Sequence, residues 1–136
     1  MGIATNWSAF GDSDIAIVVV ARESTSTTRQ AFQDQVMGQR PISPAARLAT
    51  TRSSMLNIVS ETPGAIGFIS MAALTDDVQV VPIATQDGDT PILPTIETVA
   101  SGLYPLHIPL LIIGTQAPTP NDGYYEFIAW PHWSAP

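Results

Sequence analysis

Residues 15–32, IAIVVVARESTSTTRQAF, decide the fold of this chain. An apolar and largely β-branched run ends at Arg22, a block of hydroxyl residues follows, and a helical pattern of apolar residues then begins. We predict a strand over 15–21 that is buried on both faces, a short loop, and a helix over 28–37. A strand that leads through a loop into a helix is the repeating unit of α/β proteins.

The rest of the 136-residue chain continues this alternation. A second helix capped by Thr50 or Thr51 is expected to run to about Ser60, and residues 39–50 are expected to be irregular. Strands are expected over 65–71 and 78–83, followed by a turn over 86–90. A helix is expected over 94–101, with Ile96, Val99 and Ala100 facing inward. An extended apolar segment over 104–114, at the edge of the sheet or crossing from it, and a last helix over 121–130 complete the predicted elements. Trp7 and Phe10 are expected to anchor the first residues. The pattern indicates a single α/β domain over residues 1–136.

Charge is distributed unevenly along the chain. The net charge is −7, and the five cations are all arginines within residues 1–52. Residues 53–136 carry eight acidic side chains and no arginine or lysine. Nucleic acids and anionic membranes are bound by basic surfaces, so neither is an expected partner. If an anion binds, it should bind in the first third of the chain.

The loop after the first predicted strand has the composition of half an oxyanion site. The first turn of a helix leaves backbone N–H groups unpaired and carries partial positive charge. Ser26, Thr27 and Thr28 would add hydroxyl groups, and Arg22 would add a cation at the end of the strand. The alternative is that the hydroxyls only cap the helix while Arg22 pairs with Glu23 or Asp34.

The sequence contains no residue pattern typical of a metal site, a cofactor site or a catalytic site. The chain has no cysteine, and its two histidines, His107 and His132, lie 25 positions apart without further metal ligands, so no metal site is expected. No arrangement of serine, histidine and acid suggests a nucleophile, and no glycine pattern suggests a nucleotide or another cofactor. No apolar run is long enough to span a bilayer. We therefore expect a protein that is not an enzyme.

Several motifs, in order, resemble the phosphate-binding proteins of ABC transporters, within the type 2 periplasmic-binding-protein superfamily. They are NWSAFG at 6–11, IVVVARESTSTTRQAF at 17–32, SMLNIVSETPGAIGFIS at 54–70, TPILPTIETVASGLYPLHIPLLI at 90–112, and FIAW at 127–130. The resemblance implies an α/β three-layer sandwich with a mixed, mostly parallel sheet flanked by helices. It covers about the second half of a full binding protein, which is chiefly the second lobe.

The resemblance also implies a function and its residues. Arg22 matches the family's ligand arginine, and Ser26 and Thr28 match its Ser-Gly-Thr element, with Thr27 in place of the glycine. Threonine restricts the close backbone approach that glycine permits. The implied function is binding of phosphate or a similar oxyanion; the alternative is a protein-interaction or homo-oligomeric assembly module that keeps the fold without the ligand.

Partners and location follow from the same resemblance. It implies an ABC-transporter permease or a missing first lobe as protein partners, with a homodimer as a further possibility. It places the protein outside the cytoplasm. The first residues, MGIATNW, lack a basic segment followed by an apolar one, so we expect no signal peptide within this chain.

Overall fold

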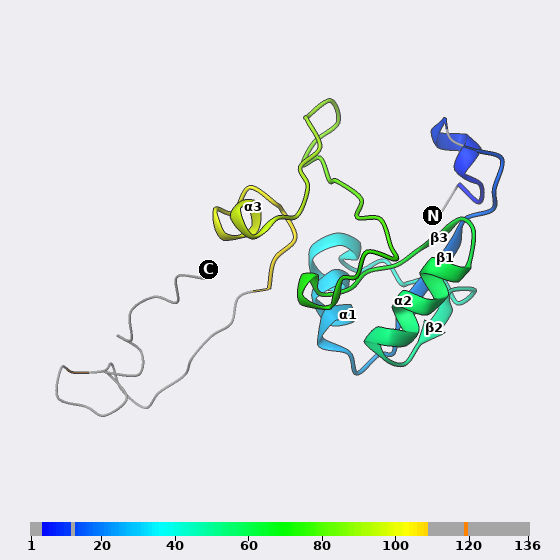
Figure 1. The fold of residues 1–136 in the computed structure, drawn as a ribbon, viewed down its shortest axis with the longest axis horizontal. Helices are drawn as coiled ribbons and strands as arrows, with labels where there is room; N and C mark the ends of the chain where they lie inside the picture. Colours follow the sequence, from blue (N-terminus) through cyan, green and yellow to red (C-terminus); the bar gives the residue numbers. More distant parts are fainter. Residues whose placement is uncertain (1–3, 12, 109–118, 120–136) are drawn as a thin grey trace.

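The computed structural model describes residues 4–11, 13–108 and 119 (Figure 1). The described residues contain a parallel sheet of three strands, β1 (Val18–Arg22), β2 (Arg47–Ala49) and β3 (Ala65–Ile66), in the order β2-β1-β3. The α-helices are α1 (Thr27–Phe32), α2 (Arg52–Glu61) and α3 (Ile96–Ala100). A π-helix, η2 (Gln33–Met37), continues α1, and two 3₁₀ turns are η1 (Trp7–Phe10) and η3 (Met71–Ala73).

The strand register brings the ends of β1 and β2 to the same edge of the sheet. Val20 pairs with Arg47 and Arg22 pairs with Ala49, so both strands end in register. On the other side of β1, Val18 pairs with Ala65. All three strands therefore point their carboxyl ends the same way, as the predicted α/β fold requires.

Helices α1 and α2 cover opposite faces of this sheet. Met55 of α2 is fully buried against Val20 and Ala49. Directly after β3, a side chain at Gly67 would collide with the Met55 sulfur, whereas the next residue, Phe68, stacks on Phe32 of α1 with ring centroids 4.3 Å apart. Because successive residues of an extended chain point to opposite faces, α2 and α1 lie on different sides. Helix, sheet and helix form the three layers that the resemblance implies.

The turn before β3 joins the first residues to the sheet. Gly64 has φ +76°, its carbonyl accepts the Val18 N–H at 3.0 Å, and the same carbonyl accepts the Trp7 indole N–H at 2.9 Å. The prediction that Trp7 anchors the first residues is confirmed. Phe10 does not serve as an anchor, because its side chain is 68% exposed. Among the described residues, the only aromatic ring that it contacts is that of Trp7.

Helix ends agree well with the sequence signals. The Thr51 side chain caps α2 by accepting the Ser54 N–H at 3.0 Å, and α2 ends one residue past the expected Ser60. Gly102, with φ +73°, follows the end of α3. The predicted helix over 28–37 forms, but its second half widens into η2, and Gln33 donates to the carbonyls of Gly38 and Arg40 as the helix ends.

Other expectations were wrong or lie outside the described residues. Segment 39–50, expected to be irregular, contains β2, and the strand expected over 65–71 is only two residues long. Residues 78–83 form no strand; Ile83 makes a single antiparallel bridge with Ile92, and Pro82 has no N–H to donate. Ile96 and Ala100 are exposed rather than inward, Ile96 at 71%. Residues 104–108 form no strand; residues 109–114 and the helix over 121–130 fall outside the described residues.

Candidate functional site

The predicted site residues lie at the carboxyl edge of the sheet. Arg22 is the last residue of β1, and the chain turns through Glu23–Thr25 into α1, whose N-cap is Ser26. From β1 the chain passes through α1 to β2 on one side, then through α2 to β3 on the other side of β1. Ligands of open α/β sheets bind outside the carboxyl ends of strands where the connections diverge in this way. The topology therefore places Arg22 at the position in the fold where a ligand is expected.

The Arg22 side chain is held firmly and is only 11% exposed. Its Nε and Nη2 donate to the two carboxylate oxygens of Glu23 at 3.0 and 2.7 Å, and Nε also donates to the Ala49 carbonyl at 3.2 Å. The hydrogen bond from Arg22 lowers the pKa of Glu23 below its ordinary value. The sequence predicted Glu23 or Asp34 as an alternative partner of Arg22, and the ion pair in the structure is with Glu23. Nη1 has no acceptor among the described residues and still carries two N–H donors.

The hydroxyl residues form the amino end of α1. Ser26 is buried; its Oγ accepts the Arg29 N–H at 3.4 Å and its own N–H donates to the Glu23 carbonyl at 3.1 Å. Thr27 is exposed and Thr28 is partly buried. Within residues 4–11 and 13–108, no acceptor lies against the N–H groups of Thr27 and Thr28, as expected for the first turn of a helix. The amides and hydroxyls of Thr27 and Thr28 thus have no hydrogen-bond partner among the described residues.

Two charged residues beside Arg22 were not included among the predicted ligand residues. Glu23 pairs with Arg22, and Arg29 donates from Nη1 to the Arg22 carbonyl at 2.7 Å while staying partly buried. The sequence signal for both is their position: Glu23 directly follows the strand, and Arg29 is the third residue of the helix. Sequence alone does not indicate which way either side chain turns.

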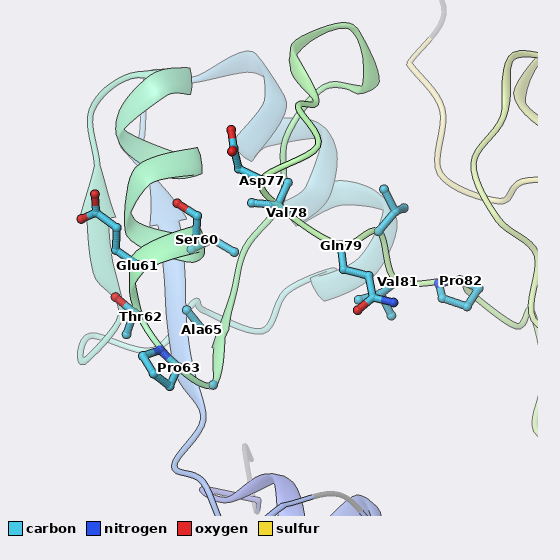
Figure 2. Close-up of a pocket in the computed structure, with 13 residues that line it drawn as sticks. Ser60, Glu61, Thr62, Pro63, Ala65, Asp77, Val78, Gln79, Val81 and Pro82 are labelled. Carbon is cyan, nitrogen blue, oxygen red and sulfur yellow. The ribbon is translucent and has the colours of Figure 1, made fainter.

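A hollow in the described part of the chain lies away from these residues. It has a volume of about 560 Å³ and is open to solvent, and it is lined by the end of α2, the turn before β3 and residues 77–82 (Figure 2). The turn residues Pro63 and Gly64 precede β3, so this hollow is at the amino edge of the sheet, away from Arg22. Its charged lining residues are Glu61 and Asp77, which disfavour an anion.

No group of three or more metal-ligating side chains gathers in the described part of the chain. No helix among residues 4–11 and 13–108 is long and apolar enough to cross a membrane.

The open parallel sheet, the helices on both faces and the polar carboxyl edge define an α/β lobe of the ligand-binding type. The family described as "PBP superfamily domain" matches residues 1–131, and the chain belongs to this family. The family resemblance and the fold class predicted from the sequence motifs are both confirmed.

Three similar proteins carry names that refer to phosphate binding or transport. The phosphate-binding protein PstS of Bacillus subtilis (strain 168) is 33% identical over 106 residues, which is 77% of this chain and 33% of that protein. A putative phosphate ABC transporter substrate-binding protein of Clostridium perfringens, solved with bound phosphate, is 32% identical with a TM-score of 0.66 over 77% of this chain and 41% of that one. An ABC-type phosphate transport receptor of Vibrio cholerae is 32% identical with a TM-score of 0.64 over 76% and 41%. The chain thus spans about a third of the length of the curated relative and two fifths of the solved ones.

Proposed function

We propose that this chain contributes one lobe of a solute-binding protein for phosphate or a similar oxyanion. The observation that carries the proposal is the Arg22 guanidinium, pinned by Glu23 and the Ala49 carbonyl, beside the free amides of Thr27 and Thr28. The similarity to a phosphate-transport protein solved with bound phosphate supports the same ligand. We propose that residues 1–136 form one domain of that binding protein.

The chemistry of the edge suits an oxyanion. Nη1 of Arg22 offers charge-assisted N–H donors, while the Thr27 and Thr28 amides and the hydroxyls of Ser26, Thr27 and Thr28 offer neutral ones. The net charge of −7 does not prevent binding, because charges farther away than about 8–10 Å are screened at physiological ionic strength. Direct donors at contact distance dominate over this distant charge.

The protein's role follows from the class of its relatives. A binding protein captures its ligand without changing it, so we propose no catalytic activity. An ABC transporter would receive the anion, and the protein would work outside the cytoplasm. The remaining part of such a binding protein would close over the carboxyl edge of this lobe and exclude water from the anion.

Isothermal titration calorimetry of the full-length protein with inorganic phosphate tests the proposal. Arg22→Gln removes the charged donors, and its matched control is Arg40→Gln, which removes the same charge at the far end of η2, where Arg40 donates to the Met37 carbonyl. Loss of a hydrogen bond to a charged group costs about 1.5–3 kcal/mol, so Arg22→Gln should weaken binding roughly 10- to 100-fold. Arg40→Gln should leave the affinity nearly unchanged. Absence of heat with wild-type protein, or equal losses in both variants, would contradict the proposal.

A further inference from the structure

The positive charge of Arg22 is already compensated within the structure. Both oxygens of the Glu23 carboxylate accept from its guanidinium, and this is the only ion pair among the described residues. Arg22 and Glu23 together therefore present hydrogen-bond donors but no net charge. A second cation beside them would strengthen the binding of an anion at this edge.

Arg29 is the cation that the structure places there. Its Nη1 donates to the Arg22 carbonyl, which fixes the guanidinium at the end of β1. Its backbone N–H is held by Ser26, the N-cap of α1. The charges of Arg22, Glu23 and Arg29 sum to +1 at the edge of a protein whose overall charge is −7. Arg29 has no carboxylate partner in the part of the chain that the structure describes.

We propose that Arg29 is a second anion-contacting residue of this site. This inference rests on the proposed function, and it assigns to Arg29 a role that is separate from that of Arg22. The carbonyl of Arg22 uses one N–H of the Arg29 guanidinium, and no acceptor among the described residues uses Nε or Nη2. The planar fork of an arginine anchored at one nitrogen can offer its other nitrogens to two oxygens of one anion.

Anchoring on a backbone carbonyl has an energetic consequence. A free surface arginine loses much side-chain entropy when it closes on a ligand. Arg29 is already restrained by its bond to the Arg22 carbonyl and by partial burial, so part of that cost is met before the anion arrives. A preorganised cation contributes more to affinity than an equally charged mobile one.

The test is phosphate binding by Arg29→Gln, with Arg40→Gln as the control of equal charge. We expect Arg29→Gln to raise Kd roughly 10- to 100-fold, because it removes charge-assisted hydrogen bonds, and Arg40→Gln to change Kd less than about twofold. Arg29→Lys, which keeps the charge but loses the fork, should give an intermediate Kd. The melting temperature without phosphate should be measured for each variant, so that loss of the bond to the Arg22 carbonyl is seen separately from loss of the ligand.

A double variant separates contact from charge alone. Glu23→Gln combined with Arg29→Gln restores the local charge of +1 but leaves no guanidinium at position 29. If Arg29 contacts the anion, the double variant stays weaker than wild type; recovery of wild-type affinity would overturn the inference. Tight phosphate binding by wild type and Arg29→Gln alike would overturn this inference and leave the proposed function standing. No binding by wild type would overturn both.

Discussion

The turn that sets β3 beside β1 gives the sharpest test of the fold. At Gly64, φ is +76°, and a Cβ atom would lie 2.3 Å from the Ala16 carbonyl oxygen. Gly88 is a matched control, since its φ is +91° and a Cβ there would meet nothing within 4 Å. Both glycines hold the left-handed backbone conformation, but only Gly64 is pressed against the backbone of another segment.

The two contributions can be added for Gly64→Ala. A left-handed conformation costs a residue with a Cβ about 1–2 kcal/mol, and both Gly64→Ala and Gly88→Ala should lose this amount. Only Gly64→Ala must also push two backbone segments apart, and such overpacking costs about 1–3 kcal/mol. The shift also strains the Gly64 carbonyl, which accepts from both Val18 and Trp7. We expect Gly64→Ala to lose about 2–5 kcal/mol in total, since the conformational and packing costs add.

Urea unfolding followed by circular dichroism measures both variants against wild type. Gly64→Ala should be less stable than Gly88→Ala by about 1–3 kcal/mol, with little change in the slope of the transition. The indole N–H signal of Trp7 in a ¹H–¹⁵N spectrum supplies a local probe, because this group donates to the Gly64 carbonyl. Equal destabilisation of the two variants would refute the close approach of this turn to residues 15–16.

Three further predictions concern the core, a helix cap and pH. Met55→Ala should cost about 2–5 kcal/mol of the free energy of unfolding because Met55 is fully buried, whereas Met71→Ala, at an exposed site, should cost far less in the same assay. Thr51→Ala should cost about 1 kcal/mol by removing the cap of α2, and Thr51→Ser should keep most of it. The pKa of Glu23 is lowered from 4.5 in the folded state by Arg22, so the stabilisation is present above that value and is lost as the pH falls through the lowered pKa. Thermal unfolding from about pH 6 to about pH 3 should therefore show a smaller loss for Glu23→Gln than for wild type; equal losses would argue against the Arg22–Glu23 pair.

Sequence reasoning succeeded where neighbouring residues decide the structure. The cap at Thr51 and the end of α2 next to Ser60 depend on a few consecutive residues, and each is where the sequence predicts it. The β2 strand was missed because its three residues are a strand only by pairing with β1. The strand predicted over 78–83 does not form for the opposite reason. Its residues alternate in polarity as a strand would, but among the described residues they pair with another segment only through the single bridge between Ile83 and Ile92.

The candidate site was predictable in place but not in detail. The order of strand, arginine, hydroxyl residues and helix locates Arg22, Ser26, Thr27 and Thr28 at one edge of the sheet, as the structure has them. Their role as ligands stays a prediction. The pairing of both Glu23 oxygens with Arg22 and the anchoring of Arg29 on the Arg22 carbonyl depend on side-chain directions, which no local pattern encodes.

Amide chemical shifts report most directly on whether an anion binds at the carboxyl edge. In a ¹H–¹⁵N spectrum of the full-length protein titrated with inorganic phosphate, the largest shifts should fall on the Thr27 and Thr28 amides, with the Arg22 and Arg29 side-chain Nε–H signals moving in step. The same titration with Arg22→Gln should need a far higher phosphate concentration. Shifts that gather at the hollow lined by Glu61 and Asp77, or a wild-type spectrum that does not change, would contradict the account.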